Sequence, residues 1–197
     1  AAVRARRRRR QRRRAPDPVV FTLLLVMIAQ RLIDARQRIQ QLSPETQVAL
    51  DQLAVVPSHV VSWLVMALLG GTAPLAEAEE RGMVELRPEG LTFRHELARH
   101  ALEHSMPASR RMAFNRAVME ALLAHDHADL SRIVHHAVAA GEVPTILSYG
   151  PLAAREAAQA GAHSQALAHY EHVVAHLEAL PDRAQAQILV EYAWQLY

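Results

Sequence analysis

The sequence contains no cysteine and no lysine, and only 5% of its residues are aromatic. Without cysteine, neither a disulfide framework nor a thiolate metal site can form. Without lysine, the chain cannot contain the G-x-x-x-x-G-K-[ST] loop that holds nucleotide phosphates in P-loop proteins. No Ser-His-Asp or Cys-His arrangement stands out either. We therefore predict that this chain is not itself an enzyme and that it holds no cofactor and no metal of its own.

Long apolar segments are also scarce. The run Val19–Ala29 is 11 residues long, whereas a helix needs about 20 apolar residues to span a bilayer. The run follows an Arg-rich head, as in a signal peptide, but a small-x-small cleavage pattern is missing. We favour a buried helix that continues to about Gln41, with a signal peptide or membrane anchor as the alternative.

The charge of the chain is unevenly distributed. Nine of its 22 arginines lie in the first 14 residues, and the other 183 residues hold 13 Arg and all 20 acidic residues, a formal net charge of −7. The head, residues 1–16, is predicted to be a disordered tail, with a basic arm for nucleic acid or anionic lipid as the alternative. The acidic remainder argues against a broad nucleic-acid surface, because phosphate binding needs a basic one.

Three short helices are predicted between residues 43 and 81. Ser43 and Pro44 start the first helix, because serine is a favoured N-cap and proline suits the first helical position. The second helix is expected to have Ser58 as its N-cap and to end at Gly70. The predicted helices cover about 44–56, 59–69 and 74–81.

A two-stranded hairpin is predicted after these helices. Residues 83–87 and 91–94 alternate apolar and polar side chains, as half-buried strands do. Between them, Pro88-Glu89-Gly90 has the composition of a turn. Three helices followed by a two-stranded wing is the order of a winged-helix domain, which we predict over residues 43–106.

Helical patterns fill the chain after Phe93. The first of these helices is expected to present Leu97, Ala98, Ala101 and Leu102 on one apolar face and to stop at Pro107. Further helices are predicted at 108–124, 129–140, 144–160, 163–179 and 182–197.

One helix pair in this region has the pattern of a tetratricopeptide unit. The residues that fit the pattern are Gly161, Ala166, Tyr170, Val174, Leu177 and Pro181. A single unit cannot bury its face alone, so we expect a longer array that this chain truncates at Tyr197. The predicted fold is mainly α: a helical lid or linker at 17–42, the winged-helix domain at 43–106, and an α-solenoid, a tetratricopeptide-like helical array, at 107–197.

Several histidine patterns could in principle bind metal. His95 and His100 resemble the H-E-x-x-H protease signature, but His100 comes one residue late, which puts the two about 140° apart around a helix. His100 and His104 do share a face and have a spacing that can bind zinc. The sequence identifies no third ligand for them, so we predict a structural role.

The other histidines are predicted to be ordinary surface residues. His169, His172 and His176 would line one edge of a helix beside its apolar face, and we expect this stripe to be solvated. A second group lies near predicted helix ends, where histidine is common. Its members are His125, His127, His135 and His136.

About three quarters of the chain, from residue 42 to 197, resembles the middle of bacterial signal-transduction ATPases with numerous domains. The closest likeness is to large LuxR-type, MalT-like transcriptional regulators. The resemblance rests on Leu42–Glu45 with Ala54–Val56, on the F-x-H-x-L-x-R junction Phe93–Arg99, on Arg110-Arg111, and on Ala166–Tyr170. It implies a cytoplasmic parent protein that binds ATP or ADP through a P-loop domain preceding residue 1 and binds DNA through a helix-turn-helix following residue 197.

The resemblance also implies partners and one site residue. The winged helix would contact the nucleotide-binding domain of the same protein, and His95 would sense the β-phosphate of ADP. Asp17-Pro18 would open the helical lid. The helical array would serve self-association or bind a protein or small-molecule inducer, and no membrane is implied. Related architectures carry a nucleotide cyclase domain, which is one alternative. Another is a stand-alone helical interaction module with a basic N-terminal arm.

Overall fold

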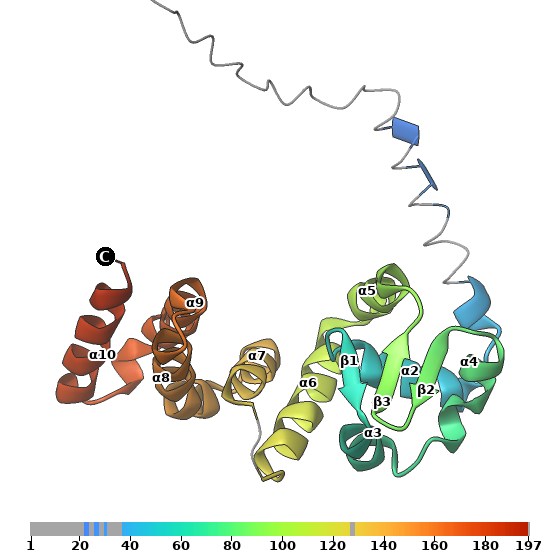
Figure 1. Cartoon of the computed structure of the whole chain (residues 1–197), viewed down its shortest axis with the longest axis horizontal. Coiled ribbons are helices and arrows are strands. Elements are labelled where there is room, and N and C mark those ends of the chain that lie inside the picture. Colours follow the sequence, from blue (N-terminus) through green and yellow to red (C-terminus); the bar gives the residue numbers. More distant parts are fainter. Residues whose placement is uncertain (1–21, 24–25, 28–29, 31–36, 127–128, 197) are drawn as a thin grey trace, which may run out of the picture.

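A computed structural model describes residues 22–23, 26–27, 30, 37–126 and 129–196. This part of the chain is mainly helical, with one small antiparallel sheet of three strands (Figure 1). The Arg-rich head lies outside it, as do His127, most of the apolar run 19–29 and most of the predicted lid. No helix among the described residues is both long and apolar enough to cross a membrane.

Helix α2, Pro44–Ala54, begins as predicted. The Ser43 hydroxyl accepts a hydrogen bond from the backbone N–H of Thr46 at 3.3 Å, so the cap satisfies one of the free donors of the first turn. Pro44 stands at the start, where its missing N–H costs nothing. The buried face of the helix includes Leu50 and Leu53, which places α2 at the centre of the first core.

The second predicted helix is wrong in its first three residues. His59–Val61 form strand β1, and helix α3 covers only Ser62–Leu69. Two adjacent β-branched valines favour an extended backbone, and β1 pairs antiparallel with residues 90–92. Ser58 has a φ of 64° and does not cap the helix. The predicted end is confirmed, because Gly70 adopts the left-handed conformation there.

The predicted hairpin is confirmed and forms the rest of the sheet. A 3₁₀ turn, η1 (Ala73–Leu75), and the short helix α4 (Ala76–Glu80) lead into strands β2 (Val84–Arg87) and β3 (Gly90–Phe93). The sheet order is β1-β3-β2, with β3 in the centre. Helices α2, α3 and α4 surround this sheet in Figure 1.

The helical part of the chain follows the predicted boundaries closely. It contains α5 (Glu96–Ser105), α6 (Ala108–Leu123), α7 (Leu130–Ala140), α8 (Val143–Gln159), α9 (His163–Val174), η2 (Leu177–Ala179) and α10 (Asp182–Gln195). The helix predicted to reach residue 179 ends at Val174, and a 3₁₀ turn replaces its last part. The residue after α7, Gly141, is left-handed, as the glycine there predicted.

Two cores fill the described part, and α6 contributes to both. The first joins α2, α3, the sheet and α5 with Val118 and Leu122 of α6 and Ile133 of α7. The second begins at Met119 of α6 and continues through α7, α8 and α9 to Ile188 of α10. Figure 1 shows α6 running between the sheet and the remaining helices.

Helices α8 and α9 pack closely at a glycine. A Cβ on Gly150 would lie 2.4 Å from a methyl carbon of Val173, so only glycine permits this approach. Ala166 and Tyr170, two of the positions in the tetratricopeptide pattern, are buried on α9. Val174 and Leu177 are partly buried against the same core.

Gly90 should be intolerant of any side chain, because its φ is 151° and an added Cβ would lie 2.1 Å from the Val60 carbonyl oxygen. We expect Gly90→Ala to lower the free energy of unfolding by at least about 2 kcal/mol in urea denaturation. Gly71→Ala is the matched control, because a Cβ there meets no atom within 4 Å; we expect a change within about 0.5 kcal/mol. Equal effects of the two variants would contradict this account of the hairpin.

Candidate functional site

Arg99 fixes α5 to the rest of the fold. Its side chain is 3% exposed, and its guanidinium donates to the backbone carbonyl of Ala54, at the C-terminal end of α2. It also pairs with Glu96 at 2.7 Å and with Glu103 at 3.0 Å. A buried cation needs such partners, because an unpaired charge in a protein interior costs several kcal/mol.

The predicted apolar face of α5 is therefore wrong at one position. Leu97 is 48% exposed, whereas Leu102 is buried, together with Arg99. The carbonyl groups at the C-terminal end of α2 attract the Arg99 guanidinium. The face of α5 that carries Arg99 therefore packs inward, and Leu97 stays on the exposed face.

His95 lies at the N-cap position of α5, as predicted from the junction motif. It is exposed and extended, its carbonyl accepts from the N–H of Ala98 at 2.9 Å, and its ring does not cap the helix. Within the described part of the chain, the ring has no hydrogen-bond partner. It is thus free to meet another molecule at the positive end of a helix. Its role as a phosphate sensor stays a prediction.

His100 and His104 do share a face of α5, and the structure adds the residue that the sequence did not single out. Glu103 brings a carboxylate oxygen to the two rings, so that one possible ligand atom from each residue lies within 4.8 Å of the others. The sequence shows that Glu103 follows His100 by three residues, a spacing that places both side chains on one face of a helix. Only the structure shows that the carboxylate lies close to both rings.

Two histidines are buried, contrary to the prediction for the second half of the chain. His136 is 0% exposed and lies in the middle of α7, where its Nδ1 hydrogen-bonds Asn115 of α6 at 2.8 Å. The Asn115 amide N–H₂ donates to the Arg111 carbonyl. Its oxygen therefore faces the ring, which donates from Nδ1. Burial lowers the pKa of His136 to about 3, and the nearby charges of His135 and Arg132 act in the same direction.

His169 is the second buried histidine, so the predicted solvated stripe is wrong there. Helix α7 covers this position, and Ser131 hydrogen-bonds His169 Nε2 at 2.9 Å. The other ring nitrogen has no hydrogen-bond partner among the described residues. A Ser-His-Asp triad needs a carboxylate at that nitrogen, so this contact does not form one within the described part. His172 stays exposed, and His176 lies beyond the end of α9.

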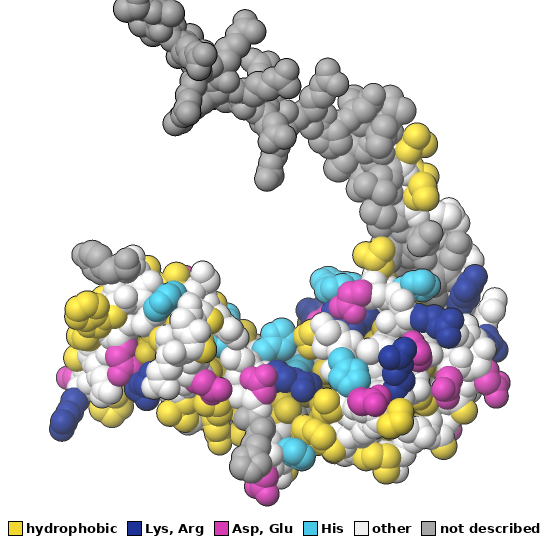
Figure 2. All heavy atoms as spheres, viewed as in Figure 1, with side chains coloured by type: hydrophobic (Ala, Val, Ile, Leu, Met, Phe, Trp, Pro, Cys, Tyr) yellow, Lys and Arg dark blue, Asp and Glu magenta, His cyan; other side chains and the backbone are white. Residues whose placement is uncertain are grey.

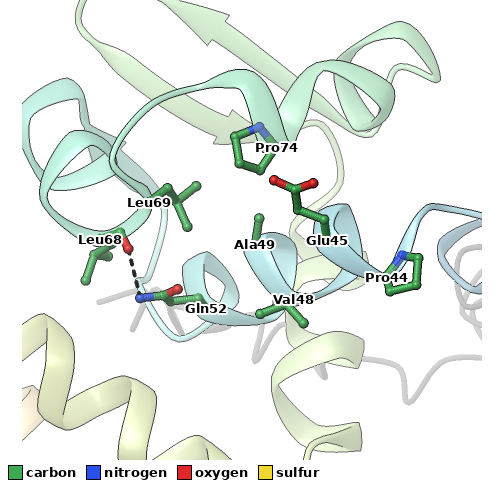
Figure 3. Close-up of a pocket in the computed structure, with 8 residues that line it drawn as sticks. All are labelled: Pro44, Glu45, Val48, Ala49, Gln52, Leu68, Leu69 and Pro74. Carbon is green, nitrogen blue, oxygen red and sulfur yellow. Dashed lines mark hydrogen bonds between the residues drawn. The ribbon is translucent and has the colours of Figure 1, made fainter.

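A shallow apolar hollow of about 450 Å³ lies between α2, α3 and η1 (Figure 3). Its lining is formed by Pro44, Glu45, Val48, Ala49, Gln52, Leu68, Leu69 and Pro74. The Gln52 amide at its edge donates to the Leu68 carbonyl at 3.3 Å. Glu45 carries the one ionisable side chain among these lining residues, and no second acid–base or nucleophilic group lines the hollow beside it.

Removing the buried Arg99 side chain should weaken the contact between α5 and α2. We expect Arg99→Ala to lower the free energy of unfolding by about 3 kcal/mol, because it leaves the Ala54 carbonyl buried without its donor. Urea denaturation followed by circular dichroism would measure this. Arg116→Ala is the control, since the Arg116–Glu142 pair is half-exposed and should contribute no more than about 1 kcal/mol. Equal losses would show that Arg99 is not a special anchor.

The buried His136 should make stability depend on pH. An unfolded histidine binds a proton near pH 6.5, whereas folded His136 resists protonation down to about pH 3. The unfolded state therefore binds more protons, and stability falls as pH drops from about 6.5 towards 3. We expect His136→Gln, which keeps a donor for Asn115, to reduce proton uptake on unfolding by about one at pH 5. An unchanged proton uptake in the His136→Gln variant would contradict the assignment.

No protein-family model, no curated protein and no solved structure matches this chain.

Proposed function

We propose that this chain is the regulatory middle segment of an ATP-dependent, LuxR-type transcriptional regulator. In this role it relays the nucleotide state of a neighbouring domain to a helical sensor or oligomerisation region. The single observation that supports the proposal best is the order of elements. Helix α2, strand β1, helices α3 and α4, and strands β2 and β3 form a sheet of order β1-β3-β2. This is the arrangement expected of a winged-helix domain, with β2 and β3 as its wing.

The way the two halves are joined supports a relay. Helix α6 places Val118 and Leu122 in the first core and Met119 in the second. Arg99 holds the preceding helix, α5, against α2. A nucleotide-dependent contact on the winged-helix domain would therefore move these helices with it, and differential contacts of this kind are what shifts a population between two states.

The proposed winged helix has the wrong charge for reading DNA. Its predicted second and third helices, residues 59–81, contain Glu77, Glu79 and Glu80 against a single arginine, Arg81. The Glu77 carboxylate already has partners within the chain, because it accepts a hydrogen bond from the Ser43 N–H at 2.7 Å and forms an ion pair with Arg81. On the face shown in Figure 2, basic and acidic side chains are interspersed over the described residues rather than gathered in one basic patch. DNA contact is therefore assigned to a helix-turn-helix elsewhere in the parent protein.

The helical array supplies surfaces for self-association or for an inducer. Helices α8 and α9 form an antiparallel hairpin, and α10 packs against α9, as expected of a tetratricopeptide-like arrangement. The outer side of α10 exposes Leu189, Val190 and Trp194, the last at 74%. Apolar side chains are visible at this end of the molecule in Figure 2. Stacked helical repeats bury such faces against a neighbour.

Sequencing the genomic DNA on both sides of this segment tests the proposal. We expect one continuous reading frame with a P-loop upstream and a helix-turn-helix downstream. A cyclase domain in the same frame would instead assign the segment to the cyclase-linked signalling proteins. A frame that encodes none of these would contradict the proposal and favour the stand-alone interaction module. Salt-sensitive nucleic-acid binding that is lost on removal of residues 1–16 would then identify the head as its basic arm.

In the intact protein, His95→Ala should weaken ADP binding. A hydrogen bond to a charged phosphate contributes about 1.5–3 kcal/mol, so we expect the dissociation constant of ADP to rise by at least about tenfold. Competition with a fluorescent ADP analogue measures this. His163→Ala, at an exposed histidine of the helical array, is the matched control. Unchanged ADP affinity together with unchanged basal activity would remove His95 from this role.

A further inference from the structure

Helix α5 carries three metal-binding side chains on one side, and the relay described above does not use them. We propose that His100, Glu103 and His104 together bind one Zn²⁺ ion. Zinc binding at α5 would need only these side chains and would not require the proposed function.

The spacing of the three residues suits a single ion. Positions i, i+3 and i+4 of a helix lie on one face, one turn apart. In this structure one ligand atom from each residue lies within 4.8 Å of the other two. In a tetrahedral zinc site, bonds of about 2.1 Å place neighbouring ligand atoms about 3.4 Å apart. The rings must therefore move inward by about 1 Å, and His100, which is 51% exposed, has room to rotate.

One ring is already held in the tautomer that a metal needs. His104 Nδ1 hydrogen-bonds the backbone carbonyl of His100 at 2.8 Å. A carbonyl only accepts, so Nδ1 carries the hydrogen and Nε2 keeps its lone pair. Metal-binding histidines characteristically donate their second ring N–H to a carbonyl or carboxylate in this way, which fixes the ring.

The other two ligands compete with a cation that is already present. Arg99 lies 3.0 Å from one oxygen of Glu103 and 3.2 Å from His100 Nε2. A guanidinium can only donate, so His100 Nε2 accepts from Arg99 in this structure, and the exposed ring must turn away from Arg99 to present that lone pair to a zinc ion. The Glu103 oxygen that pairs with Arg99, Oε2, is also the one that lies 3.9 Å from His100 Nδ1, so the ion would compete with Arg99 for this carboxylate. Arg99 retains Ala54 and Glu96 as partners.

The donor set selects the class of metal. Two imidazole nitrogens and one carboxylate oxygen suit Zn²⁺, whereas Ca²⁺ and Mg²⁺ prefer sites made only of oxygen. Two carboxylates, Glu96 and Glu103, surround the site against the single charge of Arg99, which favours a cation. Three protein ligands leave the remaining position of the zinc ion to water.

Titration of the whole chain with ZnCl₂ by isothermal calorimetry, in a buffer that does not bind metal, tests the proposal. We expect the chain to bind one Zn²⁺ at this site. Each of His100→Ala and His104→Ala should weaken binding at least about tenfold, since even loss of a residue behind the ligands typically costs 10–100-fold. His172→Ala is the matched control. His172 and His176 have the same sequence spacing, but α9 ends between them at Val174, so this variant should bind zinc as the unaltered chain does.

A second measurement on the unaltered chain keeps the result independent of how the variants fold. Histidine modification by diethyl pyrocarbonate, mapped by mass spectrometry, should be slowed by Zn²⁺ at His100 and His104 and not at His163. The proposal is overturned if the chain takes up no zinc, if the His100→Ala and His104→Ala variants bind it as before, or if these two rings are not protected. An equal loss on His172→Ala would also overturn it, because zinc would then bind surface histidines in general.

Discussion

The hydrogen bond from Arg99 to the Ala54 carbonyl is the constraint that holds α5 against α2 in the first core, directly before the helix that contributes to both cores. A guanidinium that is almost fully buried must be paired, because an isolated buried charge would raise the free energy of the folded state by several kcal/mol. The pairing is possible only because the free carbonyls at the end of α2 point towards α5. One interaction therefore satisfies a helix end, neutralises part of a buried charge and sets the orientation of α5. That orientation puts His95 at the exposed start of the helix and the His100–His104 pair on its outer side.

Helix α6 extends this constraint to the rest of the chain. Because Val118 and Leu122 face one core and Met119 faces the other, the helix cannot turn about its axis without opening a cavity on one side, and deleted core volume is costly. The Asn115–His136 hydrogen bond adds a polar restraint between α6 and α7 within the same interior. A buried polar contact of this kind is satisfied in only one register, and it therefore fixes the angle at which the helical array leaves the first core.

Much of the fold could be predicted from the sequence, because its boundaries are set by local chemistry. Ser43-Pro44 starts a helix, Gly70 and Gly141 end helices, and Pro88-Glu89-Gly90 turns a hairpin, each through interactions within a few residues. Strand β1 escaped prediction because its three residues become a strand only by pairing with residues 90–92, about 30 positions away. The burial of Arg99 and His136 escaped for the same reason, since Ala54 and Asn115 approach them only in the folded chain. Glu103, the third residue of the proposed zinc site, was visible only as a spacing, and the structure shows that its carboxylate lies beside the two histidine rings.

The two sides of α5 are linked through Glu103. Its Oε2 oxygen pairs with the buried Arg99 and also lies 3.9 Å from His100 Nδ1, so the proposed ion and the guanidinium would share this carboxylate. An ion on the outer side would draw negative charge away from the guanidinium on the inner side, and the guanidinium would then depend more on Ala54 and Glu96. Because ion and guanidinium share one carboxylate, occupancy of the outer site and tightness of the inner contact cannot be independent. A cation bound on the outer side of α5 would therefore act most directly on the Arg99–Ala54 contact, which holds the helix that precedes α6.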